Sequence, residues 1–233
     1  MQLTLHNKWL LTVVSVALAA SACSVEATAG SDTAFWSALR FTASEVEQYA
    51  SVEEMAASAD LVVVGSIESI AVGRTWGSED PTDRLVSLVL QVKIDEVLKG
   101  KPLPGASDIV SVERTMTSFS PDTLRESLTD RGLKIDDSTF AEIPKGRAVW
   151  FLRVRADLGS ELAPADVPFA GGQPYRLVSS MGLIVEGPDG SGTTPMAVIG
   201  PFHDREPKLP EERLLAEIAN VGFQGVVDIA SSP

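Results

Sequence analysis

The stretch RLVSLVLQVKID, residues 84–95, alternates apolar side chains with a mixed set over its whole length. The apolar side chains that share one side are Val86, Leu88, Leu90, Val92 and Ile94. A repeat of two residues places such side chains on one face of an extended strand. The stretch therefore predicts a long β-strand with one buried face.

The flanking sequence predicts further strands. Residues 60–72 are rich in β-branched residues and predict a buried strand, and residues 107–116 and 147–157 predict two more. Residues 175–187 and 195–200 flank the glycine-rich PDGSG and predict a hairpin. A polar loop, a helical insertion and segments rich in glycine and proline separate these strands, and five or six strands with a few helices are most simply a small barrel.

Helix signals lie between and after these strands. Ser51 with Glu54 has the spacing of a capping box and predicts a short helix to Ala59. Ser120 followed by proline predicts a helical insertion that ends before Gly132. A further helix is expected to begin at Pro210 and to end before Gly222.

The predicted fold is mainly β: a small antiparallel OB-like barrel of five to six strands, with a helical insertion and a C-terminal helix. The expected organisation is a signal peptide at residues 1–22, a flexible tether at 23–45, the β-barrel domain at 46–222 and a tail at 223–233.

The order of four segments is similar to that of a group of exported bacterial proteins. The segments are SADLVVVGSI, a long strand that ends in VLKG, AVWFLRV and YRLVSSMGLIVEG. Their domain resembles the netrin/TIMP-type OB barrel, and the resemblance spans about residues 50–220. It implies the barrel alone, because TIMP-type inhibitors have disulfides and a free N-terminal cysteine, whereas this chain has a single cysteine, Cys23.

The N-terminus has the pattern of an export signal. Lys8 precedes an apolar run from Trp9 to Ala20, which is too short to cross about 30 Å of hydrocarbon as a helix. The sequence Ala20-Ser21-Ala22-Cys23 resembles the lipobox of bacterial lipoproteins, in which the cysteine is acylated. This resemblance implies a lipid anchor at Cys23 and a domain that faces outward from the cell membrane.

A second interpretation of the same residues is ordinary secretion. Ala20-x-Ala22 also fits a signal-peptidase site, and cleavage there would leave Cys23 as a free thiol on an exported protein. An unpaired thiol is a liability in an oxidising compartment, whereas an acylated one is inert. This difference favours lipidation.

The chain is strongly acidic. Its formal net charge is −13, and removal of residues 1–22, whose only charged side chain is Lys8, leaves −14. Such a chain repels nucleic acid phosphates and anionic lipid headgroups, so no nucleic-acid partner is expected. A basic protein, a cationic peptide or a divalent cation is electrostatically permitted.

Few residues carry the signature of catalysis or metal binding. The chain after residue 22 retains one histidine, His203, and has no cysteine pair, so we predict no metal and no cofactor. No serine lies in a G-x-S-x-G motif, and His203 beside Asp204 is interpreted as a surface pair. We therefore predict no enzyme; the alternatives are an exported hydrolase that uses His203 and a structural envelope protein.

Binding is the predicted activity. Trp76 and Arg74 lie in the polar segment 73–84, where a large apolar side chain is not needed for a core. Tryptophan and arginine are common anchors at interfaces, and OB barrels bind ligands through loops and one sheet face. We predict that Trp76 and Arg74 contact a protein or an envelope component; the alternative is that Trp76 folds back over the barrel mouth.

Overall fold

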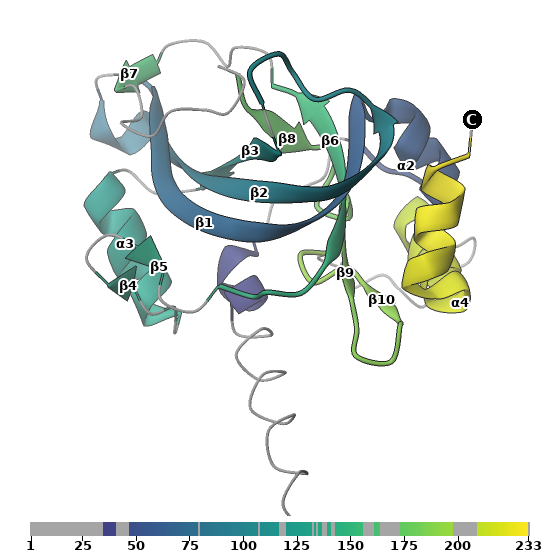
Figure 1. Cartoon of the computed structure of the whole chain (residues 1–233). Helices are drawn as coiled ribbons and strands as arrows, with labels where there is room; N and C mark the ends of the chain where they lie inside the picture. Colours follow the sequence, from purple (N-terminus) through teal and green to yellow (C-terminus); the bar gives the residue numbers. More distant parts are fainter. Residues whose placement is uncertain are drawn as a thin grey trace, which may run out of the picture.

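The structure is a computed structural model of the chain (Figure 1). It describes residues 35–40, 47–78, 80–106, 108–116, 120–131, 133, 135–136, 139–140, 143–155, 161–163, 173–197 and 209–232. The strands are β1 (Leu61–Gly77), β2 (Arg84–Gly100), β3 (Ile109–Met116), β4 (Ile135–Asp136), β5 (Thr139–Phe140), β6 (Ala148–Val154), β7 (Glu161–Ala163), β8 (Tyr175–Leu177), β9 (Leu183–Glu186) and β10 (Gly192–Thr193). The helices are α2 (Val52–Ser58), the 3₁₀ turn η1 (Pro81–Asp83), α3 (Pro121–Asp130) and α4 (Pro210–Ala230).

Five strands close into a ring, and this confirms the OB-like barrel. The pairing runs β1–β2–β3–β8–β6, and β6 pairs back onto β1 through contacts such as Val63 with Trp150. Strand β7 extends the sheet beside β1, and β9 and β10 extend it beside β6. One pair in the ring, β3 with β8, is parallel, at Val112 and Tyr175. The other pairs are antiparallel, as expected.

The long strand predicted at residues 84–95 forms as part of β2. Four of its five predicted inner side chains are buried, with Val86, Leu88 and Val92 at 0% exposure, and the fifth, Ile94, is partly buried. Ser87 and Val89 on the other side are also fully buried, so both faces of this part of β2 are covered. Ser51 and Ser120 cap the N-termini of α2 and α3, as predicted.

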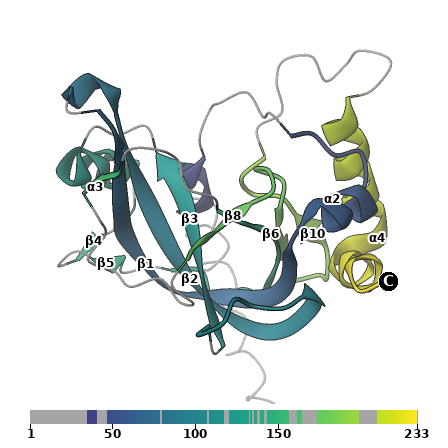
Figure 2. The ribbon, with the colours of Figure 1, turned by 90° about the horizontal axis from the view of Figure 1, so that it is seen from above.

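Two hydrophobic cores lie on opposite sides of β1 and β6. The first fills the barrel and includes Val63 and Trp150, and the second packs α2 and α4 against the outside of the same strands through Val62, Val64 and Phe151. Figure 2 shows α2 and α4 together on one side of the barrel and α3 on the other. The adjacent side chains of these strands therefore alternate between two dry environments.

The predicted tether is wrong over residues 35–40. Residues 35–39 are helical, and Phe35, Trp36 and Leu39 are at most 5% exposed in the barrel core. Arg131, just after α3, donates from Nη1 to Ala38 O at 3.0 Å and holds this helix in place. The folded domain therefore includes residues 35–40, because their apolar side chains complete the barrel core.

The predicted tail at 223–233 is also wrong for the residues that the structure describes. Helix α4 bends at Gly222, whose φ of 70° favours glycine, and then continues to Ala230. Phe223 and Val226 beyond the bend are 1% and 0% exposed in the second core. The Phe223 amide donates to Gly190 O at 2.9 Å, so the bend fits against the β9–β10 turn.

Two further boundaries differ from the prediction. Strand β1 continues to Gly77, so residues 73–77 belong to the sheet and not to a loop. The hairpin after β9 forms as expected, but its second strand is Gly192–Thr193, which precedes the predicted residues 195–200.

None of the described helices combines the length and apolar character that crossing a bilayer requires.

Candidate binding site

Strand β6 and the residue after it carry two arginines on the side that points away from the barrel interior. Arg153 and Arg155 are two residues apart, and the alternation of an extended chain puts both on one side, while Val154 between them packs on the barrel core. Each arginine pairs with a different glutamate. This side of the barrel therefore carries two separate charged clusters.

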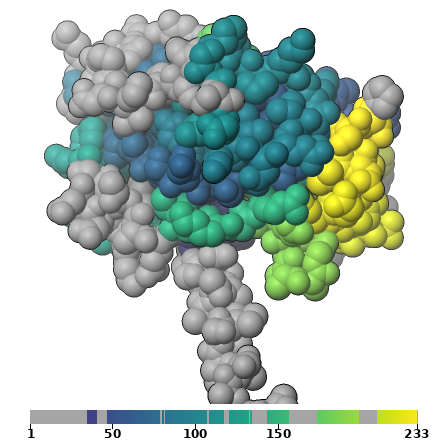
Figure 3. Space-filling model, viewed as in Figure 1, coloured from purple at the N-terminus to yellow at the C-terminus, as the bar shows by residue number. Residues whose placement is uncertain are grey.

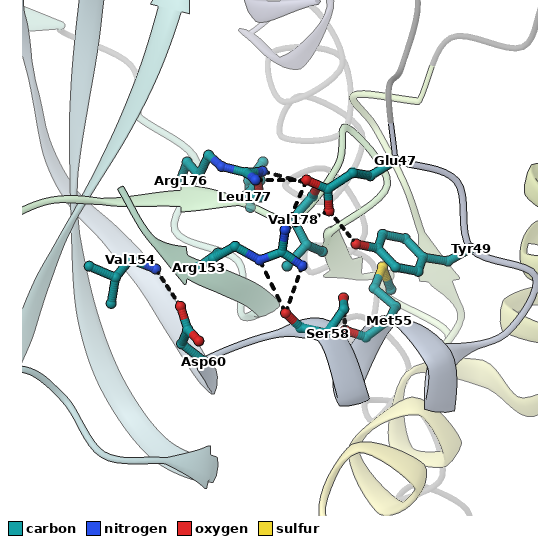
Figure 4. Close-up of polar contacts among 10 residues, drawn as sticks. All are labelled: Glu47, Tyr49, Met55, Ser58, Asp60, Arg153, Val154, Arg176, Leu177 and Val178. Carbon is teal, nitrogen blue, oxygen red and sulfur yellow. Dashed lines mark hydrogen bonds and ion pairs between the residues drawn. The ribbon is translucent and has the colours of Figure 1, made fainter. Parts of the chain in front are cut away.

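The first, the Glu47 cluster, consists of Glu47, Tyr49, Arg153 and Arg176 (Figure 4). Arg153 Nη1 donates to both carboxylate oxygens of Glu47 at 2.8 Å, and Arg176 Nη2 donates to Oε1 at 2.8 Å. The Tyr49 hydroxyl donates to Oε2 at 2.6 Å. Because Arg153 and Arg176 are directly paired across β6 and β8, one carboxylate bridges two like charges that would otherwise repel.

Backbone carbonyls fix the direction of both guanidinium groups. Arg153 donates from Nε and Nη2 to Ser58 O at 3.2 and 2.9 Å, at the C-terminal end of α2, where the helix dipole favours a cation. Arg176 donates from Nη1 to Leu177 O at 3.0 Å and to Val178 O at 3.3 Å. The arginine pair is therefore positioned by the fold as well as by Glu47.

The charges in this cluster shift two ionisation equilibria. Burial alone raises the pKa of Glu47, but the hydrogen bonds from Tyr49 and Arg176 and the positive charges of the two arginines outweigh it and hold the pKa below its usual value. Burial, followed by the hydrogen bond to Glu47, raises the pKa of Tyr49. At neutral pH two guanidinium groups and one carboxylate leave the cluster with a charge of +1.

The second, the Glu113 cluster, consists of Arg74, Ser87, Glu113 and Arg155. Arg74 makes two parallel bonds to Glu113, Nε to Oε1 at 3.0 Å and Nη2 to Oε2 at 2.6 Å. Arg155 Nε lies 3.2 Å from Oε2, and the Ser87 hydroxyl donates to Oε1 at 2.8 Å. The Arg74 guanidinium also lies over the Trp76 ring, 4.1 Å from its centroid, which is a cation–π contact.

The Glu113 cluster is buried. Glu113 and Arg155 are 2% and 6% exposed, and the side chain of Arg74 is 14% exposed. Burial lowers the pKa of Arg155 and the charge of Arg74 adds to this effect, while Glu113 opposes it. The cluster joins β1, β2 and β3 to the residue after β6, which makes it a structural brace for this side of the barrel.

The two residues predicted to bind a ligand, Trp76 and Arg74, are brought together by the structure, but not in a loop. Both lie in β1, and Trp76 is 3% exposed. The loop position was wrong because β2 and β7 pair with β1 as far as Trp76 and Gly77. A contact of these residues with a ligand stays a prediction, and the exposed indole on which it was based is not present.

The Glu47 cluster is more accessible to solvent than the Glu113 cluster. The exposed fractions of its charged side chains are 30% for Glu47, 30% for Arg153 and 34% for Arg176. A planar guanidinium binds carboxylate and phosphate oxygens in pairs, so two fixed, partly exposed arginines can take an anionic group from a partner. This cluster is the better candidate binding site.

The remaining predicted functional residues, Cys23 and His203, lie outside the described residues, as does Asp204. In the part of the chain that the structure describes, no three or more histidine, cysteine, aspartate or glutamate side chains are grouped as metal ligands.

The sequence predicts a strand over residues 147–157, which contains Arg153 and Arg155, but neither arginine is among the predicted functional residues. The signal was available, since Arg153 and Arg155 flank Val154 with the two-residue spacing that puts both arginines on one side of a strand. Glu47 and Glu113 carried no such signal. The arginine partners of Glu47 are 106 and 129 positions away in the sequence, and those of Glu113 are 39 and 42 positions away.

Comparisons of the chain with protein-family models, with curated proteins and with solved structures found no match.

Proposed function

We propose that this chain is a lipid-anchored, extracytoplasmic binding module of the bacterial cell envelope and that it does not catalyse a reaction. The location rests on the N-terminus, where an apolar run ends in the lipobox-like sequence Ala20-Ser21-Ala22-Cys23. Two or more acyl chains on Cys23 would hold the domain on a bilayer persistently, whereas one chain would not.

The binding role rests on one observation, the pair of partly exposed arginines in the Glu47 cluster. Arg153 and Arg176 are held side by side by strand pairing and by backbone carbonyls, so little side-chain freedom remains to be lost on binding. The partner that fits is a protein or an envelope component that presents a carboxylate or phosphate group. Long-range repulsion from the acidic chain would then restrict binding to partners that place this group against the arginines.

The anchor is tested by the intact mass of the protein extracted from membranes. The expected result is a chain that begins at Cys23 and carries two or three acyl chains, and that enters the detergent phase in a cloud-point separation. A Cys23→Ser variant, which cannot be acylated, should stay in the aqueous phase. A wild-type protein found unmodified in the aqueous phase would contradict the proposed location.

The binding site is tested with the lipidated protein in vesicles, incubated with fractionated envelope components. Arg176→Gln keeps the Arg153–Glu47 pair and should weaken capture of a bound component by roughly tenfold or more. Arg147→Gln is the matched control, because Arg147 is also a partly exposed arginine paired with a glutamate, Glu186, at 3.2 Å. If both variants capture the component as well as the wild type, the Glu47 cluster is not the site; Arg74→Gln tests the other predicted position in the same assay.

A further inference from the structure

The carboxylate of Glu47 lies where an anionic group of a partner would bind. In Figure 4 it lies between Arg153 and Arg176, and it accepts from Arg153 Nη1 and from Arg176 Nη2. The other bonded nitrogens of both guanidinium groups donate to backbone carbonyls. Removal of Glu47 would therefore leave two donor nitrogens that the carbonyls still hold in position for another anion.

The carboxylate is also the main attachment of Glu47 to the barrel. Residues 47–49 lie outside the helices and strands, and among the described residues they make no backbone-to-backbone hydrogen bond. Glu113 differs, because it lies within β3, pairs with Val89 of β2 and is 2% exposed. Glu47 can therefore leave its arginines with little change in the fold, whereas Glu113 cannot.

Other contacts fix the structure around the two arginines. Helix α2 begins at Val52, whose amide donates to Glu217 Oε2 of α4 at 2.8 Å, and Figure 3 shows α4 (yellow) packed against the side of the barrel. At the other end of α2, Lys99 Nζ donates to Ala56 O at 2.6 Å. Tyr49 packs against the second core. Movement of Glu47 away from the cluster would thus leave α2 and the Tyr49 hydroxyl in place.

The donors of the cluster define the group that can replace Glu47. Its Oε1 accepts from both arginines and its Oε2 from Arg153 and Tyr49, at 2.6–2.8 Å. This arrangement fits a planar group with two oxygens, whereas a phosphodiester carries two further substituents outside the plane of its charged oxygens. Asp60, the other carboxylate drawn in Figure 4, accepts from the Val154 amide at 2.8 Å. The donor set therefore favours one incoming carboxylate.

On the basis of the binding role proposed above, we infer that the arginine pair is a carboxylate site and that Glu47 is its internal occupant, which an aspartate or glutamate side chain of a protein partner displaces. An internal occupant lowers the apparent affinity in proportion to the fraction of molecules whose site is open. A partly exposed ion pair is formed roughly fivefold more often than it is open, so Glu47 should weaken binding of the partner by this factor.

Binding of a small probe tests the inference. N-acetylglutamate amide, which has one carboxylate, is titrated at constant ionic strength into the protein isolated from cells in a non-ionic detergent, and the side-chain NMR signals of Arg153 and Arg176 are followed. Glu47→Ala should bind the probe about fivefold more tightly than the wild type, because the internal carboxylate is gone. Glu186→Ala is the matched control and should not change the affinity, since Glu186 also pairs with an arginine and is 32% exposed against 30% for Glu47.

Further variants separate the occupant from the site. Glu47→Gln, which keeps the size of the side chain, should also bind more tightly, and Arg176→Gln added to Glu47→Ala should abolish the gain. If neither Glu47 variant binds the probe more tightly than the wild type, Glu47 is not an internal occupant; the proposed site still stands if Arg176→Gln alone weakens binding.

A second probe tests the chemical class of the ligand. Dimethyl phosphate has the same charge as the blocked glutamate but a tetrahedral centre, and Glu47→Ala should bind it more weakly. Tighter binding of dimethyl phosphate would overturn the carboxylate class. If neither probe shifts the signals of Arg153 and Arg176 in any variant, the arginine pair is not a binding site, and the proposed binding role fails together with this inference.

Discussion

We expect the replacement of Glu113 by glutamine to lower the free energy of unfolding strongly. Glu113→Gln keeps the size of the side chain but removes the charge that neutralises two buried guanidinium groups, those of Arg74 and Arg155. Breaking a buried ion pair by removing one partner costs about 3–5 kcal/mol of unfolding free energy. For a domain of this size each kcal/mol lowers Tm by about 2–4 °C, so the expected loss is about 6–20 °C.

Urea unfolding of a soluble form that begins at Ser24, followed by circular dichroism, measures this loss. Glu186→Gln is the control, because Glu186 pairs with Arg147 at the surface and such pairs contribute about 1 kcal/mol or less. A second variant that also replaces Arg155 by Met should lose less than the two single changes summed, since the unpaired buried charge is removed. If Glu113→Gln costs no more than Glu186→Gln, the cluster is not the structural brace described above.

Three further changes test the corrected domain boundaries and the Glu47 cluster. Leu39→Ala should cost about 2–5 kcal/mol in the same urea assay, whereas a residue in a tether would cost nothing. Phe223→Ala should cost about 3–5 kcal/mol, and a wild-type midpoint would mean that the chain beyond Gly222 contributes no core. Because its pKa is lowered in the folded chain, ionised Glu47 stabilises the fold above its ordinary pKa of 4.5, and this contribution is lost as pH falls through the lower folded value. Glu47→Gln should therefore lose up to about 1 kcal/mol at pH 7, and its midpoint should approach that of the wild type in acid; a constant difference across that range would contradict the assignment.

Local patterns predicted the elements whose stability is decided locally. The two-residue alternation of 84–95 and the capping serines Ser51 and Ser120 depend on backbone geometry and on near neighbours, and both hold in the structure. The predictions failed where a distant surface decides the outcome. Residues 35–39 lack a strong helical pattern, and they are ordered because the end of the barrel offers their apolar side chains a dry surface.

In the candidate binding site too, local features could be predicted from the sequence, whereas contacts between distant residues could not. The position of Arg153 on the outer side of a strand follows from alternation alone. Its pairing with Glu47 and its neighbour Arg176 required the closed ring of strands, which brings β6 beside β8 and the segment before α2 beside both. Trp76 looked exposed because its sequence neighbours are polar, but the pairing of β1 with β2 and β7 places it in the sheet.

The sequence by itself determined the barrel class, most strand positions and the starts of α2 and α3, because backbone periodicity and capping act over a few residues. Only the tertiary structure decided that residues 35–39 and 223–230 belong to the folded body, and which arginine meets which glutamate. The physical reason is that burial and ion pairing depend on distances in space, and ring closure sets these distances between residues that are far apart along the chain.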